Sequence, residues 1–226
     1  MKWLLPPLLT LILLIAQVLL SVLMALPFAL GGAIMCSELL GRRPGLGRAF
    51  RRSYDVMAAV PSVALGLVGW MLFSEGLGLG FSLLSGCLTL VLMLVPIMTV
   101  AFLVGLDSVP GSLREACLTL GVTRWQALWL QILPAARPAL LAGLALAVGR
   151  ATAETAALVL TSGISTRMPE SVLDPGASLA VHVYHLARDV PGGEARAYTA
   201  ALALMAINVA LHLGLTRLRR TAHVAV

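Results

Sequence analysis

The sequence predicts an all-α polytopic membrane protein, a bundle of helices embedded in lipid. Of its 226 residues, 59% are hydrophobic and only 12% are charged, and the mean hydropathy is +0.96. This composition excludes an ordinary soluble domain. The apolar runs are continuous over about 20 residues or more, whereas a β-barrel would show short alternating segments. The net charge of +6 arises mostly in short loops beside these runs, which indicates membrane orientation rather than nucleic-acid binding.

Five membrane spans are expected, and the first runs from Leu4 to about Met35. Its apolar stretch is too long for the core of a signal peptide and no small-residue cleavage site follows, so we expect it to be retained. Arginines crowd the next short loop, residues 41–53 (Arg42, Arg43, Arg48, Arg51 and Arg52). Because short cytoplasmic loops are rich in Lys and Arg, the N-terminus is predicted to lie outside.

The remaining spans follow the same charge rule. They are expected over residues 54–73, 81–106, 133–161 and 198–215. The second is broken by Pro61, and the loop after it contains Glu75 but no Lys or Arg, as expected outside. Residues 162–197 form a long extracytoplasmic loop. The chain ends in a basic segment (Arg217, Arg219 and Arg220), so the C-terminus is predicted to be cytoplasmic and residues 1–226 to form one transmembrane domain.

A polar stretch, residues 107–134, interrupts the apolar runs and predicts two short helices joined by a sharp turn. Two pairs of residues have the spacing of a capping box, Ser112 with Glu115 and Thr123 with Gln126. Gly121 lies where the first helix needs a residue that tolerates positive φ. Pro134 is expected to close the second helix. The result is a docking element between two membrane spans.

This stretch resembles the EAA loop of ABC-importer permeases, the short cytoplasmic helix that plugs into the ATPase subunit. The matching positions are Glu115, Ala116, Gly121, Leu133 and Pro134. Cys117 stands where the family usually has Ala, and Gln131 where it usually has Ile. The resemblance implies a type I ABC-importer permease fold, with coupling to the ATPase through Glu115, Ala116, Gly121, Thr123 and Pro134. The alternative is an amphipathic interfacial helix with a chance glycine.

Two charged residues, Arg150 and Glu154, lie near the middle of the fourth predicted span. Each charge at mid-bilayer costs on the order of 3 kcal/mol, so an intramembrane ion pair is by default a functional-site hypothesis. Four residues apart, they are expected to share one helix face. Arg150 is predicted to offer its guanidinium fork to an oxyanion, while Glu154 holds it in place and Thr155 adds a hydroxyl. A salt bridge that only fixes helix packing is the alternative.

The run GRATAETA, residues 149–156, resembles the RAxGETAP signature of phosphate-specific ABC permeases. Ala153 and Ala157 replace the usual Gly and Pro. The PSxxxG segment of the same permeases is matched by Pro61, Ser62 and Gly66. Ser62 either points at a permeating anion or repairs the backbone broken by Pro61, and a kink with glycine-mediated packing is the alternative. The predicted substrate pathway is therefore formed by Arg150, Glu154, Thr155 and Ser62.

The segment after residue 173 and the last span are more similar to PstA-like than to PstC-like subunits. PstA-like subunits usually have six spans, so we expect either that a peripheral first span was lost or that the start codon was assigned late.

The predicted function is that of a permease subunit in an ATP-driven importer of inorganic phosphate, in the bacterial inner or plasma membrane. No GxxxxGK[ST] motif occurs in the sequence, so ATP hydrolysis is expected on a separate chain. The resemblance also implies an extracytoplasmic phosphate-binding protein and a second homologous permease, with a heterodimer favoured over a homodimer. Besides these partners, contact with membrane lipid is expected, and no cofactor or metal is predicted.

Other functions fit parts of the sequence. The Arg150–Glu154 pair would serve another oxyanion or a phosphonate equally well. A membrane-embedded enzyme would use Glu154 with His182 and His185, but these residues lie at different predicted depths, and the two histidines are expected on a short amphipathic outer helix. A non-transporting sensor would bind the ATPase through the EAA loop and move nothing. The three cysteines have no paired spacing that indicates a disulfide or a zinc site.

Overall fold

The computed structural model describes residues 5–40 and 44–224, and the regular elements within these ranges are all helical. The α-helices are α1 (Leu5–Ile34), α2 (Pro44–Ala58), α3 (Ser62–Gly69), α4 (Leu83–Asp107), α5 (Gly111–Thr119), α6 (Arg124–Ala127), α7 (Leu133–Thr152), α8 (Ala156–Thr161), α9 (Leu179–Arg188) and α10 (Glu194–Val224). Three π-helical turns extend or join them: η1 (Met35–Leu39), η3 (Trp70–Gly76) and η4 (Leu128–Ile132).

Four helices in the described part are long and apolar enough to cross a membrane. They cover the ranges Pro7–Leu39, Leu83–Asp107, Arg124–Thr152 and Glu194–Gly214. A fifth span results if the bent pair Gly45–Ala58 and Ser62–Gly76 is counted as one crossing. The all-α class and the expected number of about five spans are thus confirmed, with the second span as the bent one.

The prediction of a loop over residues 41–53 and a span starting at Tyr54 was wrong. Helix α2 already begins at Pro44, and it meets α3 at an angle of 93°. The cause is Pro61, because a proline disfavours the helical conformation of the residue before it and has no N–H to donate. Arg48, Arg51 and Arg52 therefore lie on a helix. Arg42 and Arg43 lie outside the described residues, as do the side chains of Arg217, Arg219 and Arg220.

The fourth span differs from its prediction at both ends. α6, η4 and α7 form one continuous helix from Arg124 to Thr152, so Pro134 does not close a helix. It lies instead at the start of α7, directly after the π-helical turn η4, and the helix continues through it. At the other end α7 stops at Thr152, and a break over residues 153–155 separates it from α8.

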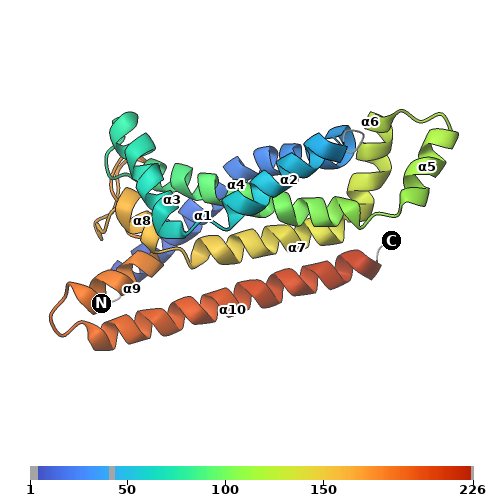
Figure 1. Cartoon of the computed structure of the whole chain (residues 1–226). Helices are drawn as coiled ribbons and strands as arrows, with labels where there is room; N and C mark the ends of the chain where they lie inside the picture. Colours follow the sequence, from blue (N-terminus) through green and yellow to red (C-terminus); the bar gives the residue numbers. More distant parts are fainter. Residues whose placement is uncertain (1–4, 41–43, 225–226) are drawn as a thin grey trace.

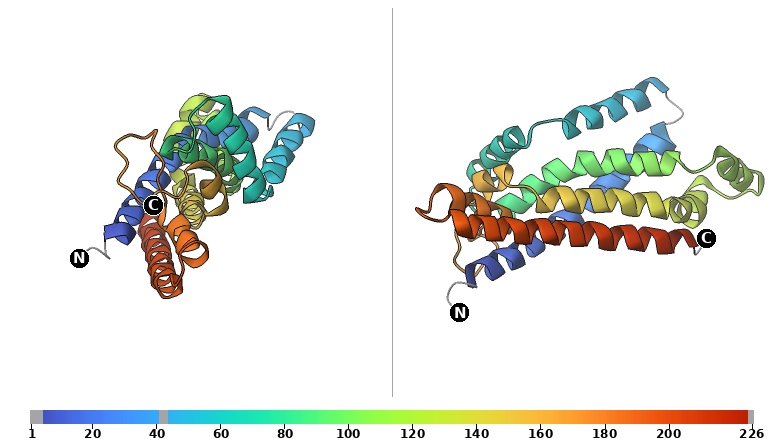
Figure 2. Two further views of the ribbon diagram at one scale, coloured as in Figure 1. Left: turned by 90° about the vertical axis from the view of Figure 1, so that its left-hand side faces the viewer. Right: turned by 90° about the horizontal axis from the view of Figure 1, so that it is seen from below.

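The long helices lie side by side and place the short ones at the two ends of the bundle (Figure 1). α5 and α6 lie at one end (the α5 end), and α3, α8 and α9 lie at the other (the α9 end). α1 crosses the bundle obliquely, whereas α7 and α10 run alongside each other (Figure 2). α1 begins at the α9 end, and α10 finishes at the α5 end.

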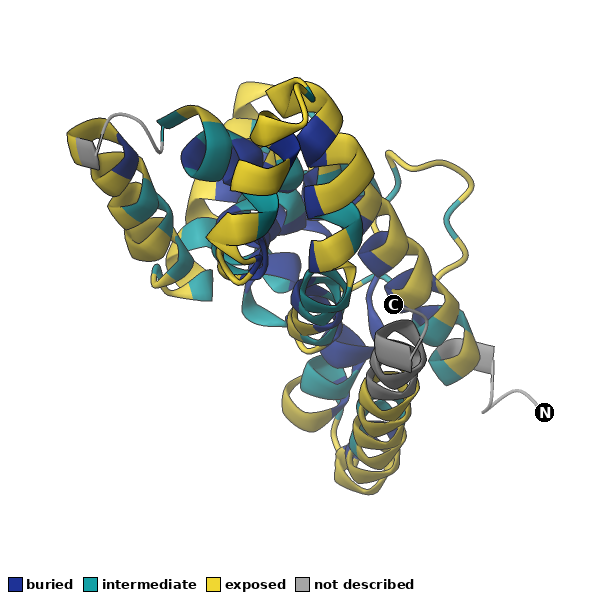
Figure 3. Ribbon diagram, turned by 90° about the vertical axis from the view of Figure 1, so that its right-hand side faces the viewer, coloured by how far each residue is buried: buried dark blue, intermediate teal, exposed yellow. Residues whose placement is uncertain are grey.

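The interior of the bundle is apolar and centred on α4. Its fully buried side chains include Leu14 of α1, Leu158 of α8 and a row along α4: Leu90, Leu94, Met98, Phe102 and Leu106. In contrast, the outer face of α1 exposes apolar side chains at helical spacing (Leu8, Ile12, Ile15, Leu19 and Leu23). Seen from the α5 end, buried positions face inward, and residues 194–214 of α10 are mostly exposed (Figure 3). Such apolar outer faces suit a protein that is surrounded by lipid.

Candidate functional site

The docking element predicted over residues 107–134 is present as α5, a tight turn and α6 at the α5 end (Figure 1). Gly121 has φ +74°, a left-handed conformation that costs any other L-residue about 1–2 kcal/mol. The Thr123 capping box is confirmed: the Gln126 N–H donates to Thr123 Oγ1 over 3.4 Å, and the Thr123 N–H donates to Gln126 Oε1 over 3.1 Å. Both predicted turn signals therefore shape the local backbone.

The other capping box, Ser112 with Glu115, does not form. α5 begins at Gly111 with Pro110 as its N-cap, and no side chain caps this end. Ser112 is then already inside the first turn, too late in the helix to serve as its cap. Glu115 and Ala116 are exposed on α5, and large apolar side chains of the docking element are exposed as well (Leu118, Leu120 and Trp125). Exposed apolar groups in such a cluster are typical of a docking surface.

Arg150 and Glu154 lie where α7 ends, and their side chains face each other across the break. Arg150 Nη2 is 3.9 Å from Glu154 Oε2. The expectation that one helix carries both was wrong, because α7 ends at Thr152 and Glu154 belongs to the break. The break is supported locally: the Ala157 N–H donates to Glu154 Oε1 over 3.2 Å, so this carboxylate satisfies a backbone donor at the start of α8.

The two members of the pair have different surroundings. The Glu154 side chain is 6% exposed, whereas that of Arg150 is 48% exposed. Leu146 and Arg150, one turn apart on α7, are both exposed, and so is Ala153 directly after the helix end. An exposed guanidinium on a membrane-spanning helix is costly if it faces lipid, so this face needs protein or water against it. The geometry leaves the fork of Arg150 open to a ligand while Glu154 stays buried behind it.

Two contacts between α7 and α10 show how deep Arg150 lies. Thr152 Oγ1 donates to Asn208 Oδ1 over 2.5 Å. The His212 ring lies against Gly149, since a Cβ on that glycine would be 2.7 Å from His212 Nε2. Asn208 and His212 are near the middle of α10 (Glu194–Val224), and the contacts flank Arg150. The Arg150 side chain therefore starts beside the middle of α10, near the point where α7 ends.

The remaining predicted pathway residues, Ser62 and Thr155, are only partly brought together with the pair. Thr155 precedes α8 as its N-cap residue. Ser62 begins α3, and Gly66 one turn later packs so closely on α8 that an added Cβ would be 2.7 Å from the Ala157 Cα. Both hydroxyl residues are half-buried. Among the described residues, no hydrogen bond joins Ser62 to Arg150 or Glu154.

Some polar contacts inside the bundle were not foreseen from the sequence. The contact of Asn208 with Thr152 was one. A polar side chain four residues before His212 in an apolar run is a visible signal that one face of this helix is polar. Gln17 was another: it is 2% exposed in α1, and its Nε2 donates to Ser162 Oγ over 2.8 Å. In both cases the partner is far away in the sequence, so the contact itself could not be predicted.

The two histidines lie on α9, the short outer helix that the sequence predicted. His182 is buried, while His185 is half-buried and its Nδ1 is 3.1 Å from Asp189 Oδ2. No group of three potential metal ligands was found among the described residues. Burial, and to a lesser extent His185, lowers the pKa of His182 from its ordinary value.

A pH dependence of stability follows from His182. Because its pKa is lower in the folded chain, the unfolded chain binds the proton first as the pH falls through about 6.5. We expect the unfolding temperature in detergent to be lower at about pH 5.5 than at about pH 7.5. His182→Gln should remove much of this fall, whereas His185→Gln should keep most of it because burial is the larger cause. Equal pH dependence in all three proteins would contradict the expectation.

The fold and the site together define a class: a membrane helix bundle with a helical docking element at one end and an ion pair in its middle. The family model described as "Binding-protein-dependent transport system inner membrane component" matches residues 29–223. The chain belongs to this family.

Curated relatives have related names. A probable ABC transporter permease protein of Bacillus subtilis, YqgI, is 29% identical over 179 residues, which cover 74% of this chain and 60% of that protein. The phosphate transport system permease protein PstC of Xylella fastidiosa is 28% identical over 218 residues (84% and 65%). PstA 1 of Mycobacterium tuberculosis is 31% identical over 204 residues (88% and 66%). The chain thus spans about two thirds or less of the length of these relatives.

Solved structures support the type I permease fold. A chain of the MetNI methionine ABC transporter in an inward-facing conformation has a TM-score of 0.75 at 16% identity, covering 98% of this chain and 97% of that one. A chain of an amino acid ABC transporter has a TM-score of 0.64 at 15% identity, covering 100% and 96%. At these identities the likeness concerns the fold. Both PstA and PstC proteins are among the relatives, so the preference for a PstA-like subunit stays a prediction.

Proposed function

We propose that this chain is a permease subunit of an ATP-driven importer and that it carries inorganic phosphate across the bacterial inner membrane. The observation that carries the proposal is the Arg150–Glu154 pair in the middle of the bundle. A buried carboxylate holds a half-exposed guanidinium there. Phosphate is a tetrahedral oxyanion that accepts two parallel hydrogen bonds from such a fork. The names of the Xylella and Mycobacterium relatives support phosphate as the substrate.

In this proposal Glu154 neutralises Arg150 when no anion is bound. Its second oxygen is engaged by the Ala157 N–H, so the carboxylate stays in place when the guanidinium turns to an anion. Thr155, between Glu154 and α8, and Ser62, at the start of α3, supply hydroxyls along the same pathway. Because no hydrogen bond in the described part of the chain joins Ser62 to Arg150 or Glu154 in this conformation, the Ser62 hydroxyl would act at another stage of transport.

The exposed face of α7 supports the presence of a second permease subunit. Leu146 and Arg150 lie on this face, and a charge at that depth is best accommodated beside protein or water. A homologous permease would cover the face and complete the pathway, with a heterodimer favoured. The N-terminus would lie outside and the C-terminus in the cytoplasm, which places α9 beside the extracytoplasmic binding protein and α5 beside the ATPase.

In the ATPase-bound complex, the docking element would couple ATP-driven closure of the ATPase to movement of the bundle. The residues that would do this are Glu115, Ala116, Gly121, Thr123 and Pro134. The first two lie on α5, and the next two shape the turn. Pro134 would mark the point where the docking element continues into α7. The motion would expose Arg150 alternately to the two sides of the membrane.

The test is ATP-dependent uptake of labelled phosphate into vesicles that contain this chain, its partner permease, the ATPase and the binding protein. We expect uptake that resists excess sulfate and molybdate. Import of another oxyanion or a phosphonate is the second candidate, because the same fork would bind either. Uptake of labelled sulfate, molybdate or phosphonate with none of phosphate would contradict the phosphate assignment.

A further inference from the structure

Two ion pairs at the α5 end each join helical elements that are distant in the sequence, η1 with α5 and α2 with α4. Arg114 of α5 contacts Glu38 of η1, with Nη2 3.0 Å from Oε1. Arg51 of α2 forms an ion pair with Asp107, the last residue of α4. The Ser37 hydroxyl lies between them, 3.4 Å from both Glu38 Oε1 and Asp107 Oδ1. The docking helix α5 is thus connected by polar side chains to the ends of α1 and α4.

Arg114 is the side chain through which α5 enters this network. Besides contacting Glu38, its Nη2 donates to the main-chain carbonyl of Leu106 over 2.8 Å, so one nitrogen bridges η1 and the end of α4. The side chains of Arg114 and Glu38 are only 28% and 25% exposed. A partly buried pair with a third partner is screened less by water than an exposed surface pair.

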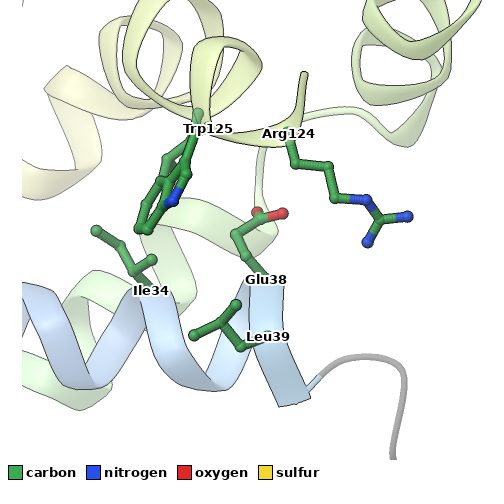
Figure 4. Close-up of a pocket in the computed structure, with 6 residues that line it drawn as sticks. Ile34, Glu38, Leu39, Arg124 and Trp125 are labelled. Carbon is green, nitrogen blue, oxygen red and sulfur yellow. The ribbon is translucent and has the colours of Figure 1, made fainter. Parts of the chain in front are cut away.

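The other side of η1 is not fastened in this way. A pocket of about 360 Å³ separates Ile34, Glu38 and Leu39 from α6 and η4, whose residues Arg124, Trp125 and Leu128 line its far wall. In Figure 4 the Arg124 guanidinium points away from the Glu38 carboxylate. The polar connection of the docking element to the end of α1 therefore runs through α5. The segment that receives it, η1, is a π-helical turn, a feature that is common at functional sites.

We propose that Arg114 and Glu38 form the joint that transmits movement of the docking helix α5 to α1 and α4. This inference rests on the proposed function, since it concerns how ATP hydrolysis is coupled to transport. Arg114 acts as a positioning residue: it touches no substrate and holds α5 against two membrane helices. When the Arg114–Glu38 ion pair is removed, α5 still binds the ATPase through its exposed face, but its movement is no longer transmitted to α1.

The test compares the amount of labelled phosphate moved per ATP hydrolysed in the full complex of both permeases, ATPase and binding protein. Arg114→Gln and Glu38→Gln should each lower this ratio at least about fivefold, with the complex still assembled and still hydrolysing ATP. Arg114→Lys keeps the charge but loses the fork, and should give an intermediate ratio. Arg137→Gln, at an exposed arginine of α7, is the control and should leave the ratio unchanged.

The charge exchange Arg114→Glu with Glu38→Arg separates coupling from a merely structural role. It restores the ion pair but not the hydrogen bond to the Leu106 carbonyl, so the ratio should rise above that of either single variant without reaching the wild-type value. A wild-type ratio in Arg114→Gln, or no recovery in the exchanged pair, would overturn the joint.

A second measurement does not depend on the substrate. Hydrogen exchange of the backbone amides of α5 and η1 should be faster in Arg114→Gln than in the wild type, within the assembled complex. If the wild-type complex hydrolyses ATP but moves no phosphate, the proposed substrate fails while the joint can still be judged. Faster exchange in the variant then supports the joint, and unchanged exchange overturns it.

Discussion

Arg150→Ala should lower ATP-dependent phosphate uptake by about 10- to 100-fold while the complex with the ATPase stays assembled. The size of the effect reflects the loss of charge-assisted hydrogen bonds of about 1.5–3 kcal/mol, where about 1.4 kcal/mol corresponds to a factor of ten. Arg150→Lys should retain part of the uptake, because an ammonium keeps the charge but cannot bind two oxygens in a plane. Initial uptake rates in vesicles, normalised to the amount of assembled complex, are the measurement.

Loss of Arg150 also leaves Glu154 as a buried carboxylate without its partner, which destabilises the protein by itself. The double variant Arg150→Gln with Glu154→Gln removes both charges together and serves as the control for this effect. It should assemble with the ATPase and still fail to move phosphate. Arg167→Ala, at an exposed position of the loop after α8, should transport like the wild type. Wild-type uptake in the double variant would contradict the anion site.

Gly121→Val should uncouple ATP hydrolysis from uptake and reduce binding of the ATPase. Gly121 has φ +74° and nothing lies within 4 Å of an added Cβ, so the expected effect comes from the backbone alone. A β-branched residue in the left-handed region is a strong outlier, at a cost of at least about 1–2 kcal/mol. The turn would open and α5 would leave its position relative to α6. Pull-down of the ATPase and the phosphate-to-ATP ratio measure the two effects.

Gly78→Val is the matched control for this experiment. Gly78 has φ +68° and equally free surroundings, but it lies in the loop between η3 and α4. The same strain there should lower the unfolding temperature similarly without affecting ATPase binding. Gly121→Asn should be tolerated better than Val, because Asn adopts positive φ more readily. If Val at positions 78 and 121 has the same effect on coupling, the turn has no special role.

Several features could be predicted because their signals are local. Continuous apolar runs predicted the all-α class and most spans, and the Gly121 turn with its Thr123–Gln126 capping box formed as expected. The Ser112–Glu115 box failed although its spacing was equally good. α5 begins at Gly111 with Pro110 as its N-cap, so Ser112 lies inside the helix and cannot cap it. The residue at which each helix begins therefore decided which of the two similar patterns formed a capping box.

The candidate site was predicted in composition but not in geometry. The sequence identified Arg150 and Glu154 as charges within a span, and their pairing at 3.9 Å agrees with that. The break at residues 153–155 was not expected. Before it, Thr152 donates to Asn208 of α10, a contact with a distant segment, and within it Glu154 accepts from the Ala157 N–H three residues further on. The different exposure of the two side chains also follows from neighbouring helices.

The sequence by itself determined that this chain is a membrane helix bundle, where its apolar segments lie, and which residues shape the turn of the docking element. These properties depend on hydropathy and on backbone preferences within a few residues. The tertiary structure was needed to show that Arg150 is half-exposed while Glu154 is buried, that Thr152 donates to Asn208 of α10, and that Arg114 contacts Glu38. Each of these requires packing between segments far apart in the chain, whose pairing no local pattern specifies.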